Sequence, residues 1–124
     1  VNSVNYLVNT FQFDQAKETG EYILNNAKSI NQLHEKIING ELMFVAAITN
    51  DLNNAKNIFD TNKKEFKSIK SCISMQRYYY AYYTLVEPDD KQALKYKNMF
   101  LKTAKYYPNK LDAYNEQKLF DLVK

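Results

Sequence analysis

Residues 68–108 read SIKSCISMQRYYYAYYTLVEPDDKQALKYKNMFLKTAKYYP, and this stretch predicts two helices joined by the turn Glu87-Pro88-Asp89. Proline lacks an amide proton and disfavours the α conformation in the residue before it, so the first helix should end near Val86. Asp89 and Asp90 then supply an N-cap and favourable negative charge for the second helix, which Pro108 should end. Because the connection is short, the two helices should lie side by side and antiparallel.

The remainder of the chain shows the same spacing of apolar residues by three and four, which predicts further helices. Asp14 and Asn109 are the expected N-caps of two of them, the Thr49-Asn50-Asp51 cluster separates two others, and Lys63-Lys64-Glu65 is expected to be a polar joint before the hairpin. Together they make about seven helices, so the predicted fold class is all-α. The periodicity runs from Asn2 to Phe11, from Ala16 to Ala27, from Ile30 to Ala47, from Leu52 to Phe59 and from Leu111 to Val123.

The composition agrees with one helical domain. Only two glycines and two prolines occur among the 124 residues, which favours long helices over a turn-rich β fold. A chain of this length removes roughly two thirds of its unfolded surface from water, which is enough for one core. The net charge of +3 comes from scattered lysines, with Arg77 as the single arginine, a pattern more typical of a solvated surface than of a nucleic-acid reader. Cys72 stands alone, so no internal disulfide can form, and we expect a small buried side chain there.

Both glycines lie inside predicted helices. Gly20 costs about 1 kcal/mol relative to alanine unless a neighbouring helix needs the space that it leaves. Asn39-Gly40 is also a turn signal, so the apolar stretch around it is read either as one long helix or as two shorter ones.

Three short stretches of the chain align with one another on an alanine. Each alanine opens the second helix of a predicted hairpin, where a small side chain lets two helix backbones approach closely. The chain therefore resembles the tetratricopeptide-like group of helical repeats, and Ala55 followed by Phe59 fits the small-then-aromatic spacing of that family's second helix. The aligned stretches are FDQAKETGEYI, LNNAKNIFDTN and DKQALKYKNMF, whose alanines Ala16, Ala55 and Ala93 are 39 and 38 residues apart.

The resemblance implies a right-handed superhelix of stacked hairpins, with a partner-binding groove on its concave face. Its units would be residues 1–28, 29–65 and 66–108, capped by a terminal helix 109–124, in one domain that is expected to be a fragment of a longer chain. Tyrosine suits a binding groove because it offers a large apolar ring, a polar tip and little rotamer freedom to lose. Ordinary packing between units is the alternative interpretation. The residues implied for the groove are Ile37, Gly40, Phe44, Met75, Tyr78 and Tyr82.

Motifs for catalysis and for metal binding are incomplete in this chain. His34-Glu35 begins like a zinc-protease helix, but Ile38 stands where the second histidine would be. Asp51 and Asn53 resemble the start of a calcium loop that lacks the glycine and the terminal glutamate. Two glycines far apart cannot build a phosphate-binding loop. No catalytic residue, cofactor or metal site is predicted.

The leading functional hypothesis is a non-catalytic module that binds another protein or a peptide, as the soluble domain of a larger or membrane-attached protein of bacterial type. Nucleic acid is a disfavoured partner, and no apolar run reaches the ~20 residues needed for membrane insertion by this segment. A cytoplasmic location is favoured. Two alternatives stay open: a small helical-bundle enzyme or ligand-binding domain, and a structural domain whose aromatic face forms a homodimer.

Overall fold

The computed structural model describes residues 2–104 and Asp121. In this part of the chain every regular element is a helix and none is a strand, which confirms the all-α prediction. The predicted last helix, residues 109–124, and the predicted helix end at Pro108 lie outside the described residues, apart from Asp121. The six described helices are α1 (Asn2–Asn9), α2 (Phe13–Asn26), α3 (Gln32–Ile48), α4 (Leu52–Ser68), α5 (Ile73–Leu85) and α6 (Asp90–Ala104).

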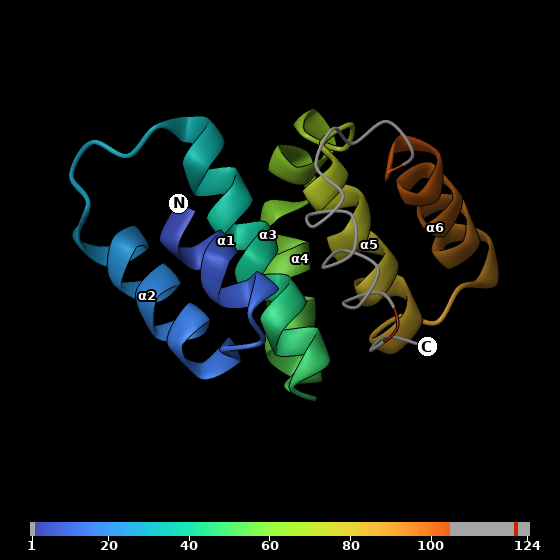
Figure 1. Cartoon of the computed structure of the whole chain (residues 1–124), viewed down its shortest axis with the longest axis horizontal. Coiled ribbons are helices and arrows are strands. Elements are labelled where there is room, and N and C mark those ends of the chain that lie inside the picture. The colour runs from blue at the N-terminus through green and yellow to red at the C-terminus, as the bar shows by residue number, and fades with distance from the viewer. Residues whose placement is uncertain (1, 105–120, 122–124) are drawn as a thin grey trace.

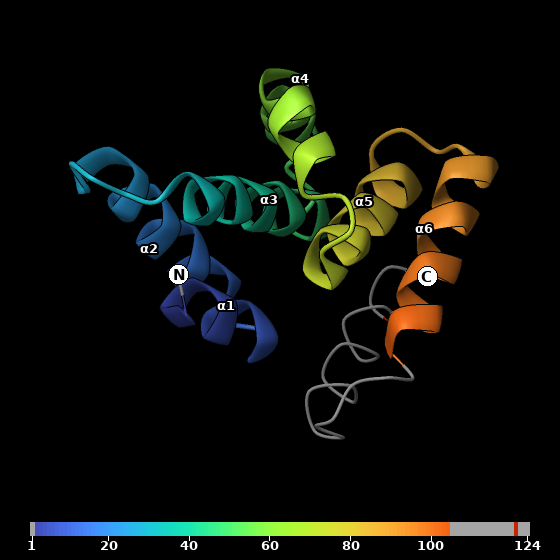
Figure 2. The ribbon, with the colours of Figure 1, turned by 90° about the horizontal axis from the view of Figure 1, so that it is seen from above.

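Consecutive helices pair as hairpins, α1 with α2, α3 with α4 and α5 with α6, and the hairpins follow one another along the long axis of the molecule (Figure 1). α3 also packs against α1, α2 and α5, so it is the central helix of the fold. Seen from above, α4 and α6 stand on opposite sides of α5 (Figure 2). Among the described helices, only α3 and α6 pack extensively against α5.

The predicted turn between the last two described helices is confirmed. α5 ends at Leu85 and α6 begins at Asp90. The Asp89 side chain caps α6, because its Oδ1 accepts hydrogen bonds from the backbone N–H groups of Lys91 (2.9 Å) and Gln92 (3.1 Å).

The three aligned alanines occupy the same place in their hairpins, since each is the fourth residue of the second helix. Ala16 and Ala55 are fully buried and Ala93 is half-buried. In each helix the backbone N–H of the alanine donates to the carbonyl of the residue that precedes the helix. These bonds run from Ala16 to Gln12 (2.9 Å), from Ala55 to Asp51 (3.0 Å) and from Ala93 to Asp89 (2.9 Å).

Two predicted boundaries are wrong. Asp14 does not cap α2, because the chain reverses at Phe11 (φ 62°) and the helix already begins at Phe13, which places Asp14 in its first turn. Lys63-Lys64-Glu65 is not a joint but part of α4, which continues to Ser68. Lysine and glutamate are good helix formers, so a charged run does not by itself end a helix.

Both glycines mark places where helices touch. A Cβ atom at Gly20 would lie 2.9 Å from Leu42 Cδ2, and one at Gly40 would lie 3.1 Å from both Met75 Sδ and Tyr78 Cδ2. Gly40 lies inside an unbroken α3, so the turn alternative at this position is wrong. The glycines therefore let α2 and α5 approach α3 closely.

Candidate functional site

The residues predicted to line a groove are mostly buried at helix contacts. Gly40 and Phe44 of α3 meet Tyr78 of α5, with the two aromatic ring centroids 5.1 Å apart. Tyr82 stacks instead on Phe59 of α4 (centroids 4.2 Å apart, planes within 13°). Of the six predicted residues, five are buried and one is half-buried: the buried ones are Gly40, Phe44, Met75, Tyr78 and Tyr82, and the half-buried one is Ile37.

Little open space remains beside these residues. Ile37, Met75 and Tyr78 line a pocket of about 90 Å³ together with Cys72, which is half-buried rather than buried as predicted. The contacts of these residues are therefore those of ordinary packing between helices, which was the alternative interpretation of the sequence. A partner could reach them only if the surrounding chain moved, and their role in binding stays a prediction.

The same interface contains two charged residues that sequence reasoning missed. Glu41 of α3 and Arg77 of α5 are 0% and 1% exposed. Arg77 donates from Nη1 to Asn9 Oδ1 on α1 (3.1 Å) and from Nη2 to the Tyr78 hydroxyl (2.9 Å), and its guanidinium lies 5.3 Å from the centroid of the Phe44 ring. Arg77 thus ties α1 to α5. The available signal was a single charge, Glu41, inside the apolar run of α3.

Burial raises the pKa of Glu41 to about 7, and the nearby Arg77 guanidinium acts in the opposite direction. Among the described residues, neither Glu41 carboxylate oxygen has a partner at hydrogen-bonding distance. Asn5 and Tyr78 lie close enough to lower the pKa by smaller amounts. The interface between α3 and α5 therefore contains a carboxyl group whose pKa lies near neutral pH.

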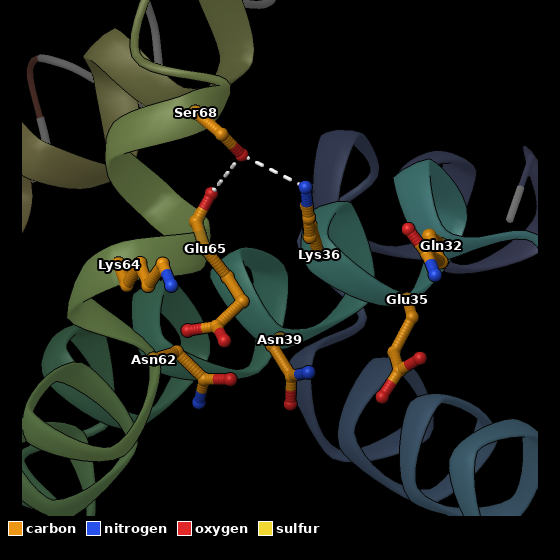
Figure 3. A pocket seen from close by; sticks show the side chains of 8 residues that line it. All are labelled: Gln32, Glu35, Lys36, Asn39, Asn62, Lys64, Glu65 and Ser68. Carbon is orange, nitrogen blue, oxygen red and sulfur yellow. Dashed lines mark hydrogen bonds between the residues drawn. The ribbon is translucent and has the colours of Figure 1, made fainter.

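A polar pocket of about 420 Å³ lies between α3 and α4. Lys36 Nζ donates to Ser68 Oγ across it (2.9 Å), and Ser68 Oγ donates to the Glu65 carbonyl (2.6 Å) (Figure 3). Two glutamates and two lysines balance its charge, and it contains no aromatic side chain, so it offers little apolar surface to hold a ligand. The lining residues are Gln32, Glu35, Lys36, Asn39, Asn62, Lys64, Glu65 and Ser68.

The larger opening is a cleft of about 700 Å³ between α4 and α6, with α5 as its floor. We call it the α4–α6 cleft. It combines aromatic rings with a concentration of positive charge, since five lysines and one glutamate line it. The lining residues are Phe59, Lys63, Lys64, Lys67, Lys70, Tyr79, Tyr83, Glu87, Gln92, Lys95 and Tyr96.

A kink in α4 separates the aromatic and the basic parts of its cleft wall. Asn62 has non-helical dihedral angles (φ −114°, ψ 16°), and its side-chain Nδ2 donates to the carbonyl of Ile58 (2.8 Å). Phe59 precedes the kink, whereas Lys63 and Lys67 follow it at a spacing of four and so lie on one face of the helix. The four-and-three spacing of Lys63, Lys67 and Lys70 was a sequence signal that could have predicted a basic face.

The aromatic floor of the cleft is held by ring stacking. Tyr79 stacks on Tyr96 (4.6 Å, 23°), and Tyr83 lies parallel to Tyr96 (5.9 Å, 4°). Phe59 forms T-shaped contacts with Tyr79 (centroids 6.3 Å apart) and with Tyr83 (5.8 Å). Lys95 Nζ lies 5.3 Å from the centroid of the Tyr96 ring, within the range of a cation–π contact. Because the rings already hold one another, little ordering remains to be done when a ligand binds.

The tyrosine hydroxyls of the floor are neutral. Burial raises the pKa values of Tyr79, Tyr83 and Tyr96 above the ordinary tyrosine range, and the neighbouring rings add to the shift of the first two. The hydroxyls therefore stay protonated at physiological pH, when each can donate a hydrogen bond to a carbonyl or carboxylate oxygen.

Among residues 2–104 and Asp121, no group of three or more His, Cys, Asp or Glu residues is placed to hold a metal ion. His34 is exposed on α3. No helix in this part of the chain is both long and apolar enough to cross a membrane. The chain matches no protein-family model, no curated protein and no solved structure, and its function is therefore inferred from the geometry of its own residues.

Proposed function

We propose that the chain is a non-catalytic interaction module that binds a segment of another protein in the α4–α6 cleft. The observation that carries this proposal is the open, aromatic-floored space of about 700 Å³. Aromatic side chains supply large contact areas at interfaces, and the stacked rings of Tyr79, Tyr83 and Tyr96 are ordered before a partner arrives. The charged groups around them are mainly lysines, which favours recognition over acid–base chemistry by paired carboxylates.

The place of the cleft in the fold also supports an interaction module. The recurrence of Ala16, Ala55 and Ala93 in three successive hairpins fits a tetratricopeptide-like stack of repeats. In such a stack each helix pair contacts mainly its neighbours, so the space between successive second helices can receive an extended segment. In this proposal that space, and not the α3–α5 contact, is the binding surface.

Peptide selection from a random displayed library tests the proposal, with two variants of α6 for comparison. Gln92→Trp fills the cleft, because Gln92 lines it and is half-buried. Leu94→Trp is the matched control, because Leu94 is 57% exposed on the same helix and is not part of the lining. Selected peptides should bind the wild-type protein and the Leu94→Trp variant and should not bind the Gln92→Trp variant.

The proposal is wrong if no selected peptide discriminates between the two tryptophan variants while both keep the helical circular dichroism of the wild type. Sedimentation at several protein concentrations checks the homodimer alternative. A concentration-dependent dimer that Gln92→Trp abolishes would assign the cleft to a second copy of the chain rather than to a peptide.

A further inference from the structure

The α4–α6 cleft carries an uneven distribution of charge in addition to its aromatic rings, and both features limit the kind of peptide segment that fits it. Resting on the proposed function, we infer that its ligand is an acidic peptide segment carrying an aromatic residue, with the acidic side chains at Lys67 and Lys70 and the aromatic ring at Tyr83. The inference stands on the distribution of charge along the cleft and on the unequal burial of its aromatic rings.

Four of the five lysines that line the cleft lack an acidic partner in the part of the chain that the structure describes. Among the described residues no carboxylate lies within 4.0 Å of the ammonium groups of Lys64, Lys67, Lys70 or Lys95. Lys63 has only an exposed contact with Asp60 (3.5 Å). Unpaired ammonium groups around a concave, partly apolar surface produce a positive potential that attracts carboxylates. The complementary ligand is therefore acidic.

The charge is not uniform along the cleft. α5 runs antiparallel to α4 (Figure 1). Lys67 and Lys70 therefore lie near the first residues of α5, whereas Glu87 lies just after the last residue of α5. The Glu87 carboxylate is paired with Lys56 of α4 (2.8 Å), which ties the turn between α5 and α6 to α4. One end of the cleft is thus basic, and the other is neutral to acidic. A nucleic-acid strand carries a phosphate at every nucleotide and would place negative charge beside Glu87, whereas a peptide can confine its charge to one end.

The end near Glu87 is also where the aromatic floor is accessible. Tyr83 is half-buried, whereas Phe59, Tyr79 and Tyr96 are buried. Tyr83 is held by stacking with both Tyr96 and Tyr79, so its exposed part offers a fixed surface for an incoming side chain. An aromatic side chain of the ligand suits this end because it adds apolar contact and brings no charge toward Glu87.

Fluorescence anisotropy with defined peptides tests the inference. The probe is a labelled peptide with a run of glutamates followed by a tryptophan, and its two comparison peptides carry glutamine in place of glutamate or alanine in place of tryptophan. Each comparison peptide should bind about tenfold more weakly, because one interface anchor is worth about 1.4 kcal/mol or more. Raising the salt concentration should weaken the labelled probe and leave the glutamine peptide unchanged.

Charge reversal locates the acidic end. Lys67→Glu/Lys70→Glu should weaken the acidic probe by about tenfold or more, because it replaces two attractions with two repulsions. Lys17→Glu/Lys28→Glu is the matched control: it changes the net charge equally, and its two exposed sites lie in and just after α2, in the first hairpin. The control should change the affinity by about twofold at most, since charges beyond a Debye length of ~10 Å are largely screened.

Three results would overturn the inference. In the first, both double variants weaken the probe equally, which means that only net charge matters. In the second, the glutamine peptide binds as tightly as the probe, or library-selected peptides occupy the cleft without acidic residues; the proposed function then stands with another ligand class. In the third, a single-stranded oligodeoxynucleotide displaces the probe and loses affinity in the Lys67→Glu/Lys70→Glu variant, which assigns the cleft to nucleic acid.

Discussion

Tyrosines lie on two sides of α5, one packed against α3 and the other lining the α4–α6 cleft. Tyr78 faces α3, where it packs on Phe44 and accepts a hydrogen bond from Arg77, and 1% of it is exposed. Tyr83 faces the α4–α6 cleft, where it is half-buried beside Tyr96. Successive residues of a helix point about 100° apart, so neighbours in a run of tyrosines are divided between the two sides. Residue type alone thus says little about which tyrosine can meet a partner.

The two sides also treat charge differently. The α3 side encloses Glu41 and Arg77 inside the protein, where Arg77 is held by hydrogen bonds to Asn9 and Tyr78 and burial raises the pKa of Glu41 to about 7. The cleft side leaves its lysines in water, where they cost little and remain available to a ligand. The α3 side therefore contributes to the fold, whereas the cleft side keeps its charged groups accessible to solvent.

The largest expected effect on stability comes from truncating Tyr78, on the side of α5 that is packed against α3. Tyr78→Ala should lower the free energy of unfolding by about 3–5 kcal/mol, because it removes a buried aromatic ring and leaves a cavity. Tyr83→Ala should cost about 1–2 kcal/mol, since a half-buried ring loses less contact with the protein. Urea unfolding of both variants measures the difference. Equal losses would contradict the division of α5 into a sealed and an open side.

The buried carboxyl should make stability depend on pH. The native Glu41 side chain holds its proton up to about pH 7, whereas the unfolded one loses it near its ordinary value of 4.5. The native state therefore binds the proton more tightly, and stability falls as the pH rises through this window, by about 3 kcal/mol for a shift of this size. Glu41→Gln should flatten the profile between pH 5 and about 8. The measurement is urea unfolding across this range.

Glu35→Gln is the control for this experiment, because Glu35 is an exposed glutamate on the same helix. Its unfolding profile should follow that of the wild type. A Glu41→Gln profile that stays parallel to the wild-type profile would place the titrating group elsewhere.

A smaller effect should follow from closing the gap between α3 and α5. Gly40→Ala places a Cβ atom 3.1 Å from the ring of Tyr78, which is buried and cannot easily move aside. Overpacking costs about 1–3 kcal/mol, and about 1 kcal/mol is recovered from the better helix propensity of alanine, so a net loss of about 1 kcal/mol is expected. Thermal unfolding beside an Asn39→Ala control measures it. A stabilised Gly40→Ala variant would show that the helix contact is loose.

The smallest expected effect concerns the acidic end of the cleft. Glu87→Gln removes a repulsion and frees Lys56, so it should raise the affinity for an all-glutamate peptide by about twofold to fivefold, the range of an exposed ion pair. It should leave the glutamate-and-tryptophan probe almost unchanged, because that probe places no charge there. Anisotropy titration of both peptides measures the difference. An equal gain for both would show that the cleft does not orient its ligand.

Much of the fold could be predicted because its signals act over a few residues. Pro88 and Asp89 place the α5–α6 turn, and the fourth-position alanines follow from turn-prone residues just before each second helix. The misplaced joint at Lys63-Lys64-Glu65 shows the limit of this reasoning, since charge is compatible with both a loop and a helix surface. The kink at Asn62, where the side chain donates a hydrogen bond to the Ile58 carbonyl, has no clear signature in the spacing of apolar residues.

The candidate site could not be predicted in the same way, because its openness depends on contacts between segments far apart in the chain. The sequence predicts a tyrosine-rich helix at α5, but the same pattern would arise whether one side of this helix or the other were covered by neighbouring helices. The side that α3 seals follows from Gly40 meeting Tyr78, and the side left open follows from α4 and α6 standing apart on either side of α5 (Figure 2). Local patterns thus decide where helices begin and end, while only the packing of distant helices decides which tyrosines and lysines face a partner.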